Sequence, residues 1–512
     1  MRTKHAIRNI GMSIFSQVII IILGFVSRKV FLDSLGSQYL GVNGLLTNVL
    51  SAMVLIEGGI GISIVYNLYK PLAEDDKNKI IALVQLYKKA YTVLAIIMLI
   101  ISCMIYPFLD KLMKTESNIS GIAIVYFIFV GKNFVSYMYA YKWALISADQ
   151  RGYYLAKNNL IFQVISMIGK IIILVVTKNY IAYLVIEFIL FIIQNMVNSN
   201  IVNKRYPYIR TKDKYTIEKD VRENINKNVR AMFIQNIGSY AIFSTDNIII
   251  SAFINVSVVG LYSNYTMIIG QLSSLVAPII SGIGNGVGNL IATESKEKSY
   301  SIFKISYFMS FWIYSISVIF LFNLLEPFID WWLKGNYLLD DFTFIVLLLN
   351  FYMNGMRISI NTFKSKAGLF AQDKYAAVVE GFINLMASII FVKKLGLVGV
   401  FLGTTLSYII LSFWNQPRIV YKNVFNKSLI SYFKKYVLYA ILTITVGFIT
   451  TNVCNLLVVG SGFMSLVAKG IICVIIPNII YILIFHKTDE FKYLWNTFKP
   501  MIVKVKNKLV VN

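Results

Sequence analysis

The chain has 512 residues, of which 57% are hydrophobic and 14% charged, and its formal net charge is +25. Soluble domains carry about 25% charged residues, so this composition excludes a soluble enzyme, a disordered chain and a disulfide-stapled secreted protein. A membrane helix needs about 20 mostly apolar residues, and the strands of outer-membrane barrels alternate apolar and polar residues. The composition therefore predicts an all-α polytopic membrane protein.

The chain begins with a basic segment and an apolar run, as a signal peptide does. Arg2, Lys4 and Arg8 precede the run, but Arg28-Lys29 follows it where a signal peptide would carry a small-residue cleavage site. We expect a retained first helix.

Fourteen apolar runs of spanning length follow one another along the chain. They lie near residues 10–32, 41–69, 83–108, 120–146, 158–177, 180–203, 230–253, 258–292, 303–325, 341–363, 375–392, 397–416, 436–456 and 462–485. The short links near Lys178 and Lys394 separate neighbouring spans. We therefore expect about 14 transmembrane helices.

Lysine and arginine are distributed unequally between alternate loops. The loops on the side of both termini hold 36 of them, and the loops on the other side hold 6. Cytoplasmic loops collect Lys and Arg, so we expect both termini in the cytoplasm. The same rule explains the basic charge without nucleic acid as a partner. Three scattered cysteines and two distant histidines form no metal-ligand spacing.

The halves of the chain resemble each other on either side of a basic loop. Residues 39–42 (Tyr-Leu-Gly-Val) resemble residues 258–261 (Val-Val-Gly-Leu). Repeats of six helices are a common way to build a transporter. We predict an N-terminal six-helix lobe (1–204), a basic cytoplasmic linker (205–229), a C-terminal six-helix lobe (230–416), and two additional helices with a basic tail (417–512).

Polar residues recur at helical spacing inside several spans. The stripes are Ser13, Gln17, Gly24 and Arg28; Asn159, Gln163, Ser166 and Lys170; Gln235, Ser239 and Asp246; Asn350, Asn354, Arg357 and Asn361; and Glu380 with Asn384. Other spans carry Glu57, Lys132 and Lys142. One interpretation is that such residues join neighbouring helices by hydrogen bonds. Full charges cost about 2.5 kcal/mol or more at the bilayer centre, and they favour a hydrophilic cavity instead.

The charges indicate what such a cavity would hold. Arginine and lysine suit an anionic ligand such as phosphate or diphosphate. Asp246 and Glu380 are candidates for binding a coupling Na⁺ or exchanging a proton, because such acids recur in ion pathways. An ion pair with Arg357 or a lysine is the alternative for these two acids.

Motifs from the N-terminus to about Tyr421 resemble one family, the Wzx-type polysaccharide-unit flippases of the multidrug/oligosaccharidyl-lipid/polysaccharide exporter superfamily. They include Arg2-Thr3-Lys4, Ser27-Arg28, the segment 39–45, the segment 69–74, Ser244-Thr245-Asp246-Asn247 and the segment 260–264.

The resemblance implies two six-helix lobes, two further helices and alternating access. It implies a multi-pass protein of the bacterial cell membrane that moves oligosaccharide on polyprenyl diphosphate from the inner to the outer leaflet, for capsule or exopolysaccharide assembly. A glycan polymerase and glycosyltransferases would be partners, beside membrane lipids, and no cofactor other than a coupling Na⁺ or H⁺ is implied.

The resemblance also assigns residues. Arg28, Lys142 and Arg357 are the expected diphosphate contacts, and Gln17 and Glu57 are further polar positions expected in the substrate site. The expected ion-coupling positions are Asp246, Glu380, Asn384, Thr404 and Thr405.

Two alternatives stay open. One is an exporter of the same fold for a peptidoglycan precursor or a drug, since fold does not fix function. The other is an enzyme, a membrane glycan polymerase. Such a polymerase would need catalytic residues on a large outer loop, and the longest outer loop expected here runs only from Glu326 to Asp341. We expect a transporter.

Overall fold

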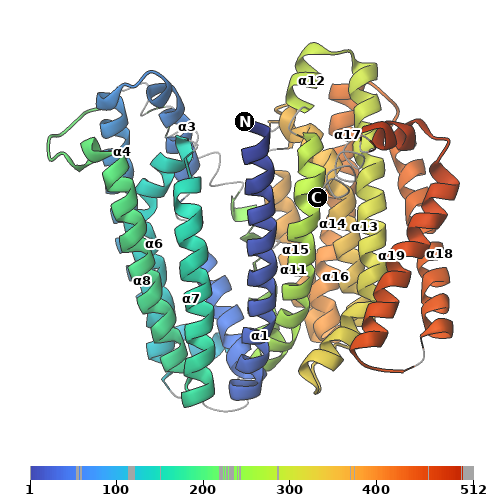
Figure 1. Ribbon diagram of the computed structural model, residues 1–512, viewed down its shortest axis with the longest axis horizontal. Helices are drawn as coiled ribbons and strands as arrows, with labels where there is room; N and C mark the ends of the chain where they lie inside the picture. The colour runs from blue at the N-terminus through green and yellow to red at the C-terminus, as the bar shows by residue number, and fades with distance from the viewer. Residues whose placement is uncertain are drawn as a thin grey trace. The chain divides into compact units, whose positions relative to one another are not determined.

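The fold is described from a computed structural model of the chain (Figure 1). The structure describes all residues except 1, 53–56, 58–59, 114–120, 150, 218–222, 224, 226–228, 230–235, 239, 242–243, 285–286, 370, 374, 459, 498 and 500–512. At residues 2–18, 62–63, 110, 277–278, 281–284, 288–289, 292 and 371 it describes the backbone alone.

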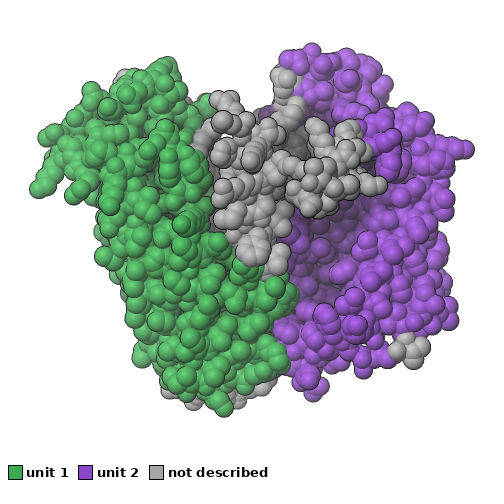
Figure 2. Space-filling model, in the orientation of Figure 1, with its two compact units in different colours: residues 1–263, 377–385 green, residues 264–376, 386–512 purple. Residues whose placement is uncertain are grey.

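The described residues form two compact units, coloured separately in Figure 2. Unit 1 comprises residues 1–263 and 377–385, and unit 2 comprises residues 264–376 and 386–512. Contacts define these units, and the lobe boundaries expected from the sequence stay a prediction.

The secondary structure of the described residues is helical throughout. The α-helices are α1 (Arg2–Ser51), α3 (Ile60–Ala73), α4 (Lys77–Ile105), α5 (Leu109–Leu112), α6 (Ile122–Ala148), α7 (Tyr153–Thr177), α8 (Tyr180–Arg205), α10 (Asp246–Phe253), α11 (Val256–Gly284), α12 (Val287–Thr293), α13 (Lys296–Leu333), α14 (Asp341–Lys366), α15 (Ala376–Leu395), α16 (Leu397–Ser407), α17 (Phe413–Val420), α18 (Ile430–Leu457) and α19 (Phe463–Phe485). Short 3₁₀ turns are η1 (Tyr106–Phe108), η2 (Pro207–Arg210) and η3 (Ala371–Asp373), and π-helical turns are η4 (Tyr408–Ser412) and η5 (Tyr421–Phe425).

Ten helices in the described part of the chain are long and apolar enough to cross a membrane. Each of them coincides with one of the fourteen expected spans. Of the other four expected spans, 10–32 lies within α1, and 41–69, 230–253 and 258–292 each include residues outside the described ones. The predicted fold class, an all-α polytopic membrane protein, is confirmed.

Backbone breaks occur where the sequence predicts links between spans. Gly36 has φ +82° inside α1, in the region that glycine occupies without steric cost, and it lies between the first two expected spans. Lys178 ends α7 with φ 50°, and the side chain of Asn179 then caps α8 by accepting from the Ala182 amide at 3.0 Å. Gly396, with φ +66°, separates α15 from α16.

In unit 1, α4, α6, α7 and α8 pack side by side, and α1 packs on α7 (Figure 1). Buried apolar residues of α4, α6 and α8 form a core in this bundle, with Leu83, Tyr87, Leu145 and Val202 among them. The linker that follows α8 is fastened to α4: the Gln85 amide donates to the Asp213 carbonyl at 2.7 Å and accepts from the Tyr215 amide at 3.2 Å.

In unit 2, α13 is the central helix, and α14, α18 and α19 pack against it. Its buried face is aromatic: Phe303, Tyr307 and Phe311 contact rings of α14, of η5 and of α18. Aromatic side chains each bury a large area and pack edge-to-face or stacked. This core holds α14, which carries Arg357, in a fixed position.

Candidate functional site

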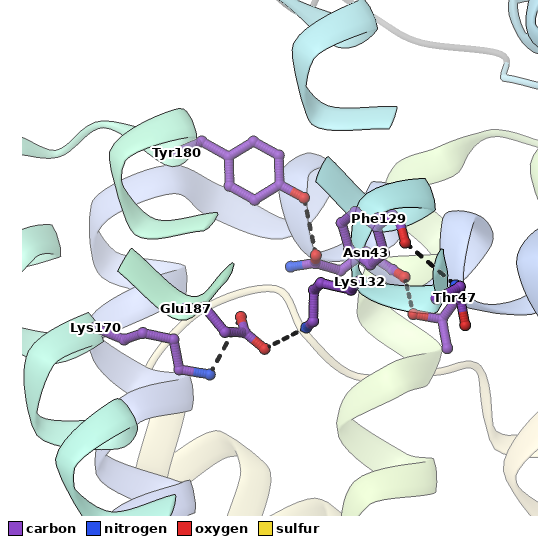
Figure 3. A network of polar contacts seen from close by, with 8 residues as sticks. Asn43, Thr47, Phe129, Lys132, Lys170, Tyr180 and Glu187 are labelled. Atoms are coloured by element: carbon purple, nitrogen blue, oxygen red, sulfur yellow. Dashed lines mark hydrogen bonds and ion pairs between the residues drawn. The ribbon is translucent and has the colours of Figure 1, made fainter. Parts of the chain in front are cut away.

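In unit 1, a carboxylate of α8 lies between a lysine of α6 and a lysine of α7 (Figure 3). The Nζ atom of Lys132 on α6 donates to Oε1 of Glu187 on α8 at 2.7 Å, and the Nζ atom of Lys170 on α7 lies 3.5 Å from Oε2. The sequence points to both lysines, but Glu187 is a residue that it does not single out. A lone acid in an apolar helix carries no periodic signal, so its position between two cations becomes visible only when three helices are packed.

Tyr180 and Asn43 lie near this group of charges (Figure 3), and Tyr183 contacts Lys170. The hydroxyl of Tyr180 donates to Oδ1 of Asn43 at 2.9 Å. Lys170 Nζ lies 5.2 Å from the ring centroid of Tyr183, a distance at which the ring attracts a cation. The Phe31 ring packs edge-on against Tyr183 with centroids 5.2 Å apart. The network thus reaches α1, one turn from Arg28.

Arg28 of unit 1 is half-buried, and its side chain donates a hydrogen bond to an uncharged group. Its Nη1 atom donates to the hydroxyl of Ser263 at 2.9 Å. Among the described residues, no carboxylate forms an ion pair with it. A serine hydroxyl brings no counter-charge, and a guanidinium has further N–H donors beyond the one that this hydrogen bond uses. This is the arrangement that an anion-binding arginine needs.

Lys142 and Glu57 lie in a different part of unit 1. Lys142 is 7% exposed and donates to the hydroxyl of Ser199. It is ten residues from Lys132 on α6, about 15 Å along the helix axis. Glu57 accepts a hydrogen bond from Tyr91, whose ring stacks on Tyr87 at 4.4 Å.

Two further points concern these expected substrate contacts. A methyl group at Gly61 would lie 2.9 Å from Oε1 of Glu57 and 2.7 Å from the Tyr91 hydroxyl, so it would displace the ends of these side chains. The side chain of Gln17 lies outside the described residues.

The expected polar stripe of α7 has two roles along its length. At one end, Asn159 Oδ1 accepts from Gln194 at 3.0 Å and from Asn198 at 2.8 Å, both on α8. These bonds hold α7 to α8, as the interhelical hydrogen-bond reading expects. At the other end the stripe carries the charge of Lys170, which pairs with Glu187.

Arg357 is the expected cation of unit 2, and a π-helical region holds it. Its Nε donates to Oε1 of Gln416 at 3.0 Å, its Nη2 donates to the Ser412 hydroxyl at 3.0 Å, and its guanidinium lies 5.4 Å from the Tyr408 ring centroid. Tyr408 and Ser412 begin and end the π-helical turn η4. Such turns recur at functional sites. Here the turn supplies two of the three contacts of Arg357, and Gln416 of α17 supplies the third.

Three of the expected ion-coupling residues belong to unit 1. Asp246 begins α10, and its Oδ1 atom is buried without a hydrogen-bond partner among the described residues. Glu380 and Asn384 are 2% and 0% exposed on successive turns of α15. A methyl group at Gly381 would lie 2.9 Å from the Gly238 carbonyl oxygen. Close backbone approach therefore fixes the turn of α15 that carries Glu380.

The two expected threonines belong to unit 2. The Thr405 hydroxyl lies 2.8 Å from Oδ1 of Asn350 on α14 and 3.1 Å from the Phe401 carbonyl. Thr405 therefore helps to pack α16 on α14. Thr404 is less buried than Thr405.

Comparisons with known proteins agree with this architecture. A family model described as "Polysaccharide biosynthesis protein" matches residues 6–283. No curated protein sequence matches the chain.

Two solved structures resemble the chain in fold. One is described as lipid II flippase MurJ in an inward closed conformation: the TM-score is 0.65, the identity 14%, and the match covers 92% of this chain and 98% of that one. The other is an inward-facing multidrug resistance MATE family transporter of the MOP superfamily, with a TM-score of 0.57, 14% identity, and coverage of 79% and 98%. At this identity the likeness concerns the fold.

Proposed function

Because the chain belongs to the polysaccharide biosynthesis protein family, we propose that it is a flippase for oligosaccharide repeat units on polyprenyl diphosphate. It carries them from the inner to the outer leaflet of the bacterial cell membrane, for capsule or exopolysaccharide assembly. The fold supports a transporter, since it resembles those of a lipid II flippase and of a multidrug transporter. The protein is not an enzyme in this proposal, and glycosyltransferases and a polymerase supply and consume its cargo.

The observation that carries the proposal is the environment of Arg28. A half-buried guanidinium that donates to a serine at 2.9 Å, and to no carboxylate among the described residues, has free capacity for an anionic oxygen. Arginine binds phosphate through a fork of donors. The negative charge of a diphosphate would be compensated by the guanidinium of Arg28. Most of a glycan is neutral and needs no such cation. Arg357 serves the same purpose in unit 2, and Lys142, Gln17 and Glu57 complete the proposed substrate contacts.

Asp246, Glu380 and Asn384, all in unit 1, form the proposed coupling-ion site. Thr404 and Thr405, which the resemblance also assigns to ion coupling, stay predicted positions in unit 2. The buried Oδ1 of Asp246 without a hydrogen-bond partner in the described part of the chain fits the need for a cation or a proton, because an uncompensated buried carboxylate is costly. Ion binding that differs between two states of the protein shifts the equilibrium between them. Such a shift would couple ion flow to alternating access, as in an antiporter.

A flipping assay tests the proposal. Proteoliposomes containing the purified protein and a lipid-linked oligosaccharide are treated with a glycosidase that cannot cross the bilayer. We expect the protein to increase the fraction of glycan that becomes accessible, and Arg28→Ala to remove the increase at equal reconstitution. No increase with the native protein, for lipid-linked oligosaccharides of several compositions, would contradict the proposal.

A second candidate cargo is a peptidoglycan precursor, because the solved structure with a TM-score of 0.65 is that of a lipid II flippase. A drug is the third. The same proteoliposomes separate the three cargoes when lipid II or a fluorescent cationic drug replaces the oligosaccharide lipid. Transport of lipid II or drug alone would reassign the cargo and leave the transporter fold unaffected.

A further inference from the structure

Glu187 interacts with each lysine through a different oxygen. Oε1 lies 2.7 Å from Lys132, and Oε2 lies 3.5 Å from Lys170. The contact to Lys132 is a short charge-assisted hydrogen bond, and the contact to Lys170 is longer and weaker. The carboxylate therefore holds one lysine firmly and the other loosely (Figure 3).

All three charged groups are partly open to their surroundings. The exposed fractions of the side chains are 25% for Lys132, 24% for Glu187 and 16% for Lys170. A fully sealed ion triad would exclude ligands. Here part of each charged side chain is left uncovered by protein atoms.

On α7, Lys170 lies on a different face from the exposed apolar residues. Exposed isoleucines of α7 recur at spacings of four, three and four residues along one face: Ile161, Ile165, Ile168 and Ile172. Lys170 is two residues from both of the last two, which is about 200° around the helix. The charge thus lies on the face opposite this apolar stripe.

The same relation holds on α8. Val185 and Ile189 are exposed apolar residues, and Glu187 lies two residues from each, again about 200° around the helix. Two neighbouring helices therefore direct their charges away from the faces that suit lipid. A polar ligand inside the bundle could reach them.

The charge of the group is unbalanced. Two lysines and one glutamate give a net charge of +1 at neutral pH. Arg28 is a further cation on α1, three residues before Phe31, whose ring contacts Tyr183. Glu187 alone cannot neutralise this region. A phosphate group offers more oxygens than a carboxylate and a larger charge, so it can satisfy both lysines at once.

We propose that Lys132 and Lys170 form a phosphate-binding site in which Glu187 is the internal counter-ion. In the empty site the carboxylate holds the lysines in place. An arriving phosphate takes Lys170 from its longer contact first and then shares Lys132 with the carboxylate, and both contacts to Glu187 return when the ligand leaves. This competition limits affinity and so permits release. The inference rests on the proposed function in one respect, that the phosphate belongs to the lipid diphosphate of the cargo.

Glu187→Gln is the decisive variant, because it keeps the shape of the side chain and removes the competing charge. The probe is inorganic diphosphate, and its affinity for the purified full-length protein in detergent is measured by calorimetry. We expect binding that is tighter by about tenfold than in the native protein, the gain from removing one competing charged contact. A merely structural ion triad predicts a less stable protein with unchanged or weaker binding, and that result would overturn the inference.

Control variants locate the site. The double variant Lys132→Ala with Lys170→Ala should lose diphosphate binding, whereas Lys157→Ala, an exposed lysine on the same helix as Lys170, should leave it unchanged. If Glu187→Gln fails to fold, Glu187→Asp replaces it: the shorter carboxylate keeps Lys132, releases Lys170, and should also tighten binding. Unchanged affinity in Glu187→Asp would contradict the inference.

Two further experiments ask which molecule supplies the phosphate, and whether a failure concerns the lysine site or the proposed flippase function. Farnesyl diphosphate should compete with inorganic diphosphate, and nanodiscs of phosphatidylglycerol should not; competition by the phospholipid alone would overturn the cargo assignment. Native diphosphate binding in the double lysine variant, combined with loss in Arg28→Ala, would refute the lysine site while the flippase proposal stands. Absence of glycan flipping by the native protein would instead refute that proposal.

Discussion

Gly41 and Gly260 exchange equivalent backbone contacts within unit 1. A methyl group at Gly41 would lie 1.8 Å from the Val256 carbonyl oxygen, and one at Gly260 would lie 1.9 Å from the Ser37 carbonyl oxygen. Ser37 and Gly41 each precede their counterparts, Val256 and Gly260, by 219 positions. This is the offset at which the sequences of the two halves resemble each other, so matching positions of α1 and α11 meet face to face.

Replacing either glycine by alanine should destabilise the protein. The added methyl group meets a carbonyl oxygen of the opposing backbone, which cannot turn away as a side chain does, and such overpacking costs about 1–3 kcal/mol. We expect Gly41→Ala and Gly260→Ala to lower the melting temperature in detergent. Gly24→Ala on the same helix α1 is the control, because nothing lies within 4 Å of the added atom. Equal melting temperatures for all three variants would contradict the close approach.

Arg28 and Arg357 should be required for glycan transport. Arg28→Ala and Arg357→Ala remove the guanidinium, and we expect transport per inserted molecule to be abolished. Lysine at either position should restore only part of it, since lysine keeps the charge without the fork of donors. Arg210→Ala, an exposed arginine in the turn η2, should transport normally. Normal transport by both alanine variants at 28 and 357 would remove these residues from the substrate site.

Asp246 and Glu380 should determine the ion dependence of transport. Asp246→Asn and Glu380→Gln keep the shape of each side chain and remove its charge, so a bound Na⁺ or proton loses its counter-charge. We expect reconstituted transport to lose its response to a Na⁺ gradient if Na⁺ is the ion, and to a pH gradient if the proton is. A response that both variants keep in full would leave the two acids with a packing role alone.

The linker after α8 should face the cytoplasm, as the excess of Lys and Arg on one side predicts. Lys212 is exposed in this segment, so Lys212→Cys offers a labelling site once the native cysteines Cys103, Cys454 and Cys473 are replaced. A membrane-impermeant maleimide should label it only after the cells are permeabilised. Strong labelling of intact cells would reverse the topology.

The sequence by itself determines the fold class and most of the helices. All ten membrane-length helices of the described residues coincide with apolar runs, because a span needs enough apolar residues to cross the bilayer core. The links at Lys178 and near Gly396 are also visible in the sequence. Periodicity alone places Lys170 on the face of its helix opposite the exposed isoleucines, since the angle between residues of one helix depends only on their spacing.

The partners of the charged residues are decided by the tertiary structure. Lys132 and Glu187 are 55 positions apart, and no pattern within either helix indicates that they meet. Arg357 likewise finds Gln416 and Ser412 through the π-helical turn η4, which shifts side chains away from the angles that a regular α-helix predicts. Spacing fixes which face of a helix a side chain occupies, but only the packing of helices fixes which charge lies opposite it. That packing makes Glu187 the counter-ion of two lysines.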